Sequence, residues 1–312
     1  MCKEHIKAIK EFIKGKATTL PILKEVAHMD GKLLATNLEV AVEITTPNIK
    51  DGVYKAEVLE LGFKEELLDK EYTTEDYPEI QTGSTIGEYS YSGEDIAKMI
   101  RAGEFVSKDQ TRPVLTGVSL KGSKVYGSDG FQLYSNRLNN DISIPITLPI
   151  KLIKLFKAVK ADKHNWTMTI YEDDMVSLTS GNITLYSKVI SGQQPDYDGL
   201  LTDNSVNTTI TLDLATLNAP KDWLVLADRE DNTIYLTDGN WENKVEISKQ
   251  ITLEDGTYEP TDERNIIMAM VTHESKRYVG VNPKLLKPYG KHTIKLYARN
   301  KMKGQLEVEI IK

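Results

Sequence analysis

The chain has 312 residues, of which 40% are hydrophobic and 27% charged, and its 39 Lys and Arg against 46 Asp and Glu give a formal net charge of −7. This composition is typical of a soluble globular protein with two or three domains. It excludes nucleic-acid binding through the overall charge, so such binding would need a local basic surface. The one cysteine, Cys2, excludes a disulfide framework and a cysteine-built zinc site and favours a reducing cytoplasm. No apolar run approaches the ~18 residues of a membrane span, so we expect no membrane association.

The first predicted helix covers residues 3–14, where isoleucines recur on one face at a helical period. Beside that face lies a stripe of lysines, which consists of Lys3, Lys7, Lys10 and Lys14.

The next helix is predicted over 57–70, a stretch rich in Glu, Lys and Leu.

Two further helices with basic side chains are predicted in the middle of the chain. Ser92 and Asp95 form a capping box for a helix over 93–103, which carries Lys98 and Arg101. Another helix follows Pro149, a residue suited to a first helical turn. Its stretch up to Lys163 has five Lys and one Asp, a local charge of +4 in a protein of net −7. The lysines on which the interpretation below depends are Lys151, Lys154, Lys157 and Lys160.

Most of the remaining chain is predicted to form short strands, because β-branched residues alternate with polar ones. A short helix is also expected near 282–287, ended by Pro288. Candidate linkers lie at 81–84 and 202–205. The clearest predicted strands are 166–170, 183–186, 208–212 and 306–310.

Two segments of the chain are similar at a constant offset of 92 positions. Within 19–37 and 111–129, TLPILKEV aligns with TRPVLTGV, and LLATN aligns with VYGSD. A weaker third copy, IYLTDG, covers 234–239. Each copy predicts two strands that are joined by a turn. At Ser128–Gly130 the aspartate can accept hydrogen bonds from nearby backbone N–H groups, and the glycine permits a positive φ.

The sequence shows no recognisable catalytic or metal-binding motif. GxGxxG and HExxH are absent, and the five histidines are scattered. The acidic cluster of Asp228, Glu230 and Asp231 lacks the spacing of a calcium loop. These observations favour a binding or scaffolding protein without catalytic residues, cofactor or metal. A β-rich hydrolase whose carboxylates cannot be paired from sequence remains an alternative.

Four strings in the chain are similar to motifs of one known family. GSDGFQL at 127–133 resembles its T-D-G-x-R-L turn, and SKVISGQQPDY at 187–197 resembles its S-K-L-x-x-G-x-F-P-D-Y segment. The segment 111–118 resembles a strand entry, and NPKLL at 282–286 resembles the helix start of the last domain. Their order and spacing resemble the bacterial sliding clamp, the beta subunit of DNA polymerase III.

The chain also departs from that family. It is shorter than typical members, and its first third lacks room for a complete unit. Gln132 stands where the family often has Arg, and the chain ends at Ile310-Ile311-Lys312 rather than in a short Met/Pro tail. We therefore expect a short, divergent member.

The resemblance implies an α+β fold of three repeated clamp-type units, with helices inside a ring and antiparallel sheets outside. The expected domains are 1–83, 84–203 and 204–312, the first of them shortened. Two copies would form a head-to-tail homodimer that encircles duplex DNA without sequence preference. DNA polymerase and the clamp loader would bind through short peptide motifs. A two-domain clamp that forms a trimer is a further alternative, although the third repeat copy argues against it.

The resemblance also assigns roles to particular side chains. Basic residues of the predicted helices would face the DNA, although a solvated helix face is the alternative interpretation. Apolar residues near the Ser-Asp-Gly turn would line a cleft for partner peptides, although Leu115 and Leu133 could equally be core. The expected DNA-facing residues are Lys3, Lys7, Lys10, Lys14, Lys98, Arg101, Lys151, Lys154, Lys157 and Lys160. The expected cleft residues are Leu115, Ser128, Gly130, Leu133, Pro195, Leu200 and Ile310.

Overall fold

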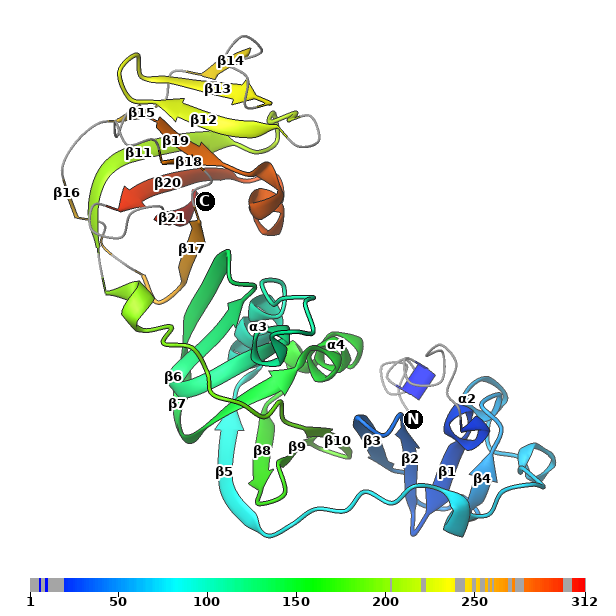
Figure 1. Cartoon of the computed structure of the whole chain (residues 1–312). Coiled ribbons are helices and arrows are strands. Elements are labelled where there is room, and N and C mark those ends of the chain that lie inside the picture. Colours follow the sequence, from blue (N-terminus) through cyan, green and yellow to red (C-terminus); the bar gives the residue numbers. More distant parts are fainter. Residues whose placement is uncertain are drawn as a thin grey trace. The chain divides into compact units, whose positions relative to one another are not determined.

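The computed structural model describes most of the chain (Figure 1). The chain divides into two compact units, which are treated separately below. Unit 1 comprises residues 1–103, 111–125 and 138–193, and unit 2 comprises 104–110, 126–137 and 194–312. The predicted division into 1–83, 84–203 and 204–312 stays a prediction, because one compact unit can contain more than one domain. The described residues are 6, 9–10, 20–202, 204–219, 223–238, 245–248, 251–252, 256–257, 259, 261–268, 271–272, 278–299 and 305–311.

Unit 1 is built on one eight-stranded antiparallel sheet in the order β4-β1-β2-β3-β10-β9-β8-β5. Strands β3 and β10 pair in register, with Val42 opposite Leu185, and so join the early and middle parts of the sequence. Two of the predicted strands, β8 and β10, are confirmed. The strands are β1 (Val26–Met29), β2 (Lys32–Thr36), β3 (Val40–Thr45), β4 (Gly52–Tyr54), β5 (Thr85–Tyr91), β8 (Trp166–Tyr171), β9 (Met175–Ser180) and β10 (Ile183–Lys188).

Two α-helices, α3 (Gly93–Ala102) and α4 (Ile150–Ala158), pack together in unit 1. The predicted capping box is confirmed, because the Ser92 side chain accepts from the backbone of Asp95 and the Asp95 carboxylate accepts from that of Ser92. Helix α4 starts directly after Pro149, which occupies its N-cap. The buried apolar side chains of the two helices are Ile96, Met99 and Ala102 of α3 and Leu152, Ile153, Leu155, Phe156 and Ala158 of α4.

The prediction of a continuous helix over 57–70 was wrong. The structure has only α2 (Val58–Leu61) and the 3₁₀ turn η2 (Glu65–Leu67) there. Gly62 ends α2 with φ +82°, which a helix cannot continue through. The other short 3₁₀ elements of unit 1 are η1 (Pro21–Lys24), η3 (Thr74–Asp76), η4 (Pro113–Thr116) and η5 (Ala161–Lys163).

Unit 2 is built on two antiparallel sheets. Its larger sheet has the order β15-β11-β20-β21-β17-β7-β6, with β16 also paired to β11, and its smaller sheet has the order β14-β13-β12-β19-β18. Strands β6 (Gly117–Ser128) and β7 (Gln132–Pro149) contribute residues to both units. The others are β11 (Ser205–Asp213), β12 (Leu224–Asp228), β13 (Thr233–Thr237), β14 (Val245–Ser248), β15 (Ile251–Thr252), β16 (Gly256–Thr257), β17 (Arg264–Met268), β18 (Val271–Thr272), β19 (Tyr278–Val281), β20 (Thr293–Arg299) and β21 (Gln305–Ile311).

Helical structure in unit 2 is limited to short 3₁₀ elements within the described residues. The segment η6 (Gly199–Leu201) follows residues 187–197, the SKVISGQQPDY string of the sequence analysis. The expected helix near 282–287 is the 3₁₀ element η8 (Pro283–Tyr289), and it continues through Pro288 instead of ending there. Asn282 begins it, because its side chain accepts a hydrogen bond from the Lys284 N–H. Among the described helices of both units, none has the length and apolar content of a membrane span.

The sequence repeat appears in the structure as two turns with the same hydrogen bonds. In unit 1, Thr36 Oγ1 donates to Val40 O at 3.1 Å and accepts from Leu38 N at 3.0 Å. Asn37 Oδ1 accepts from the N–H groups of Glu39 and Val40 at 3.1 and 3.0 Å. The third copy reaches the edge of the described residues at position 238, so its turn lies outside them.

The equivalent turn in unit 2 connects β6 to β7. Ser128 Oγ donates to Gln132 O at 2.6 Å and accepts from Gly130 N at 3.2 Å. Asp129 Oδ1 accepts from the N–H groups of Phe131 and Gln132, each at 2.8 Å. Gly130 has φ +89°, as its predicted role requires. Each bond joins residues 92 positions after those of the unit 1 turn, which confirms the offset seen in the sequence.

Candidate functional site

Helix α4 exposes its lysines and buries its apolar side chains. Lys151, Lys154 and Lys157 lie on the exposed face of the helix, opposite the buried Phe156. Lys160 is exposed just after the helix, with a left-handed backbone at φ +52°. The Lys151 ammonium donates to a carboxylate oxygen of Glu39. Ammonium groups on an exposed helix face suit contact with phosphates, because a mobile point charge needs no fixed partner geometry.

The basic residues of α3 are less open. Lys98 forms an ion pair with Glu94, one turn earlier, at 2.9 Å from Nζ to Oε1. Arg101 is half-buried in the last turn of the helix. Such a pair on a helix surface contributes about 0.2–0.5 kcal/mol and partly neutralises the ammonium. Of the two basic helices, α4 therefore exposes the basic side chains more fully.

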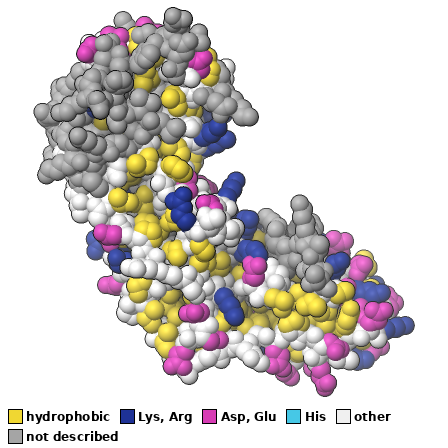
Figure 2. All heavy atoms as spheres, in the orientation of Figure 1, with side chains coloured by type: hydrophobic (Ala, Val, Ile, Leu, Met, Phe, Trp, Pro, Cys, Tyr) yellow, Lys and Arg dark blue, Asp and Glu magenta, His cyan; other side chains and the backbone are white. Residues whose placement is uncertain are grey.

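Only one residue of the N-terminal lysine stripe lies within the described residues. Ile6, Ile9 and Lys10 are helical, and Ile9 is fully buried, as the predicted apolar face requires. The Lys10 ammonium lies 2.6 Å from Glu60 Oε1 of α2. Lys3, Lys7 and Lys14 lie outside the described residues. Figure 2 shows basic and acidic side chains interspersed on the visible face of the described chain.

The residues of the predicted peptide cleft divide into turn, core and surface. Ser128 is buried and Gly130 exposed, and both serve the hairpin turn. Pro195 and Leu200 are exposed in the segment after β10, and Ile310 is half-buried in β21. These five residues belong to unit 2. Leu115 belongs to η4 of unit 1, where it is half-buried.

Leu133 belongs to a buried cluster of unit 2, which agrees with the alternative interpretation as core. The cluster also contains Tyr126, Tyr197, Leu201 and Ile266. Leu133 lies opposite Ile266 in the pairing of β7 with β17. The rings of Tyr126 and Tyr197 stack with their centroids 4.8 Å apart. The Tyr126 hydroxyl donates to Asp198 at 2.8 Å. Burial raises the pKa of Tyr126, and this hydrogen bond raises it further.

Three exposed apolar residues lie within two positions of a cluster member along the chain. Phe131 is 55% exposed, Met268 37% and Leu200 36%. The backbone joins two of them, because Met268 N donates to Phe131 O at 2.8 Å. Below, Phe131, Met268 and Leu200 are called the unit 2 apolar patch. Phe131 and Met268 were missed in the sequence, although an aromatic residue directly after Asp-Gly was a usable signal.

A buried ion pair fixes the backbone at Leu201, next to Leu200. Arg264 donates from Nε to Glu307 Oε1 at 2.6 Å and from Nη2 to Glu307 Oε2 at 2.9 Å. The same guanidinium donates to Leu201 O at 3.3 Å and to Asn204 Oδ1 at 3.1 Å. This fork joins β17, β21 and the end of η6, and so holds the chain that carries Leu200.

Metal-ligating side chains do not gather in the described part of the chain. It contains no group of three or more His, Cys, Asp or Glu residues placed to hold an ion. The cluster of Asp228, Glu230 and Asp231 builds a turn, because Asp228 Oδ1 accepts from Glu230 N and Asp231 Oδ1 accepts from Thr233 N.

Comparison with known proteins relates this architecture to one class. No family model matches the chain. It is 24% identical to the beta sliding clamp of Streptococcus pneumoniae over 222 residues, which are 67% of this chain and 58% of that protein. Six curated proteins match, and each is a beta sliding clamp.

Solved structures extend the likeness to nearly the whole chain. The DNA polymerase III beta chain of Streptococcus pneumoniae superimposes with a TM-score of 0.68 and 17% identity, covering 99% of this chain and 97% of that one. The chain is thus similar in sequence and in fold to the bacterial beta sliding clamps. A sliding clamp from Pseudomonas aeruginosa bound to griselimycin has a TM-score of 0.65 and 14% identity, covering 98% of this chain and 96% of that one.

The expected fold class is thereby confirmed as the α+β fold of the DNA clamps. The match with the pneumococcal relative spans little more than half of that protein's length. The β-rich hydrolase and the two-domain trimeric clamp are not favoured, since the structural likeness to beta clamps covers 99% of this chain.

Proposed function

We propose that this protein is a DNA sliding clamp, a non-catalytic processivity factor that encircles duplex DNA and tethers a polymerase. The observation that carries the proposal is the likeness to a DNA polymerase III beta chain over 99% of this chain. A tether acts by topology and binding, so it requires no catalytic group. The reducing cytoplasm favoured by the single cysteine is the compartment that we propose for it.

Duplex DNA is the first proposed partner. The exposed lysines of α4, with Lys98 and Arg101 of α3 and the lysines of the N-terminal helix, would contact phosphates without reading bases. This role is supported by the local charge of α4 within a chain of net −7. Phosphate contacts made by flexible ammonium groups are weak individually, which permits sliding.

Polymerase and clamp-loader peptides are the second proposed partners. The unit 2 apolar patch supports this role, because exposed Phe, Met and Leu side chains next to a rigid buried cluster can seat small apolar anchors. We propose that griselimycin, the ligand bound to the Pseudomonas clamp, binds the same patch here.

The proposed ring is a homodimer, and its mass tests the proposal. The chain has a mass of 35.1 kDa, so light scattering over a micromolar concentration series should approach about 70 kDa. Closed symmetry is the usual outcome for soluble homo-oligomers. A mass near three copies would support the trimeric alternative, and a strict monomer throughout the series would contradict ring closure.

A further inference from the structure

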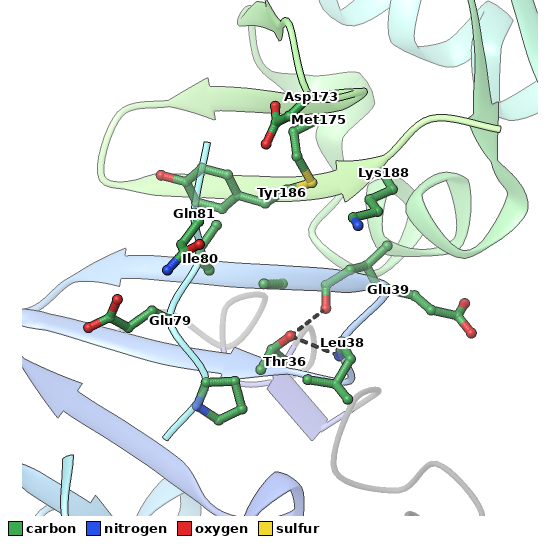
Figure 3. A pocket seen from close by; sticks show the side chains of 13 residues that line it. Thr36, Leu38, Glu39, Glu79, Ile80, Gln81, Asp173, Met175, Tyr186 and Lys188 are labelled. Atoms are coloured by element: carbon green, nitrogen blue, oxygen red, sulfur yellow. Dashed lines mark hydrogen bonds between the residues drawn. The ribbon is translucent and has the colours of Figure 1, made fainter. Parts of the chain in front are cut away.

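Unit 1 contains a cavity of about 300 Å³ at the meeting of β3, β10 and the extended segment 78–81 (Figure 3). Val40 and Ala41 contribute from β3, Met175 from β9 and Tyr186 from β10. Burial raises the pKa of Tyr186 to about 12, so its hydroxyl stays neutral at physiological pH. The volume lies at the lower end of the range of small-molecule and peptide sites.

The cavity lies at the position in the first repeat that corresponds to the unit 2 apolar patch in the second repeat. It lies beside the turn at Thr36–Val40, which has the hydrogen bonds of the turn at Ser128–Gln132. Ala41 stands 92 positions before Leu133 and pairs with Tyr186 of β10, as Leu133 pairs with Ile266 of β17. The smaller alanine leaves space where the second repeat places a leucine.

A second correspondence involves the segments after the repeats. Asp76-Tyr77 precedes Ile80, and Asp196-Tyr197 precedes Leu200 at the same spacing. Tyr77 is buried in a cluster against which Ile80 packs, and Tyr197 is buried in the cluster beside Leu200. Ile80 lines the cavity, as Leu200 contributes to the unit 2 apolar patch.

Leu38 on the cavity rim has a strained backbone. Its φ is +71°, in the left-handed region, and its side chain is 56% exposed. The equivalent residue in the second repeat is Gly130. A branched residue is less stable than glycine in this conformation, and burial does not offset that cost here. An exposed leucine kept at such a cost points to a contact outside the chain.

The cavity carries opposite charges on its two sides. Lys188 lies on one side and Glu79 on the other, with Asp173 near the β9 end (Figure 3). The Glu39 carboxylate points away from the cavity (Figure 3). It accepts a hydrogen bond from Lys151. A ligand that fits this arrangement has an apolar centre with an acidic group toward Lys188 and a basic group toward Glu79.

We propose that this cavity is a second docking site for a short, extended peptide of a partner protein. One apolar side chain lies on Ala41 and Tyr186, an acidic residue faces Lys188, and a basic residue faces Glu79 and Asp173. The repeat, the cavity and its charges support the site. Only the kind of partner rests on the proposed clamp function.

The test uses the full chain and a labelled peptide, Gly-Asp-Leu-Leu-Lys-amide, followed by fluorescence anisotropy. Wild type should bind it saturably. Lys188→Glu should weaken binding at least tenfold, and a peptide with Lys in place of Asp should restore it to that variant. Ala41→Leu, which fills the cavity with the side chain of the second repeat, should cause a similar loss while thermal unfolding stays cooperative.

Phe131→Asp is the control that separates this site from the unit 2 apolar patch, and it should leave the affinity for the peptide unchanged. Absence of saturable binding to wild type, or equal affinity in Lys188→Glu and wild type, would overturn the inference. Loss of binding in Phe131→Asp alone would also overturn it, because the peptide would then occupy the unit 2 apolar patch. None of these results depends on whether the protein forms a ring.

Discussion

Asp129 shows how a residue's role follows from local chemistry. The Ser-Asp-Gly string predicted a turn with an accepting carboxylate and a positive φ, and both features are present. Leu133, the second residue of β7, could not be assigned to core or cleft from the sequence. Its burial depends on Tyr126 and Ile266, whose contacts with it arise only from the tertiary fold.

The capping carboxylate of α3 gives a pH-dependent prediction. Burial by itself would raise the pKa of Asp95, but hydrogen bonds from the Asn139 backbone and from Ser92 outweigh it and lower the pKa below the usual 3.8. The ionised carboxylate therefore stabilises the fold above pH 3.8, and this contribution is lost as the pH falls through the lowered pKa.

Asp95→Asn should accordingly lower the free energy of unfolding by about 1–2 kcal/mol at pH 7. The difference between variant and wild type should shrink as the pH falls from 4 toward 2. Urea unfolding at several pH values measures both effects. A difference that stays constant over this range would show that the charge of Asp95 does not contribute.

The exposed residues of the unit 2 apolar patch allow a test of partner binding that Leu133 does not. A lysine at position 133 would place a charge in the buried cluster and unfold it. Phe131→Asp together with Leu200→Asp changes exposed side chains and should weaken griselimycin binding at least tenfold, because apolar anchors dominate such contacts. Calorimetry measures this affinity.

Leu61→Asp is the matched control, since Leu61 is an exposed leucine of α2. This variant should bind griselimycin like wild type. Equal binding by the Phe131 and Leu200 double variant would place the ligand site elsewhere.

At the scale of elements, periodicity identified α3, α4 and several strands, because one face of each is buried and the other solvated. It failed over 57–70, where helix-favouring residues surround a glycine whose positive φ stops the helix. The pairing of β3 with β10 could not be predicted either. It joins residues about 140 positions apart, and no local pattern specifies that register.

The lysines of α4 give the prediction at this scale. Changing Lys151, Lys154 and Lys157 to Glu should weaken DNA binding equally for all sequences. The slope of log affinity against log salt concentration should also become shallower, by about 1 for each phosphate that the protein no longer neutralises. Folding should be retained, because these side chains are exposed. Filter binding at several salt concentrations measures both quantities.

Changing Lys32, Lys50 and Lys64 to Glu is the matched control, because these exposed lysines of unit 1 form only surface ion pairs. This variant has the same net charge as the α4 variant. If both variants lose affinity equally, the effect comes from total charge and not from α4.

At the scale of the whole molecule, the 92-residue repeat and the ordered family strings predicted the clamp fold, which the solved structures confirm. The repeat could be seen because the turn chemistry of Thr36-Asn37 and Ser128-Asp129 constrains residue type at fixed positions. Ring closure has no comparable local signature, since it depends on surfaces that complement each other between copies.

Retention on DNA of different topology tests the central claim most directly. The protein is assembled on a nicked circular plasmid and separated from free protein by gel filtration, and half of the sample is then linearised with a restriction enzyme. A ring that encircles the duplex should stay on the circle at physiological salt and be lost from the linear form, because it slides off the ends. Equal retention on circular and linear DNA would contradict the account.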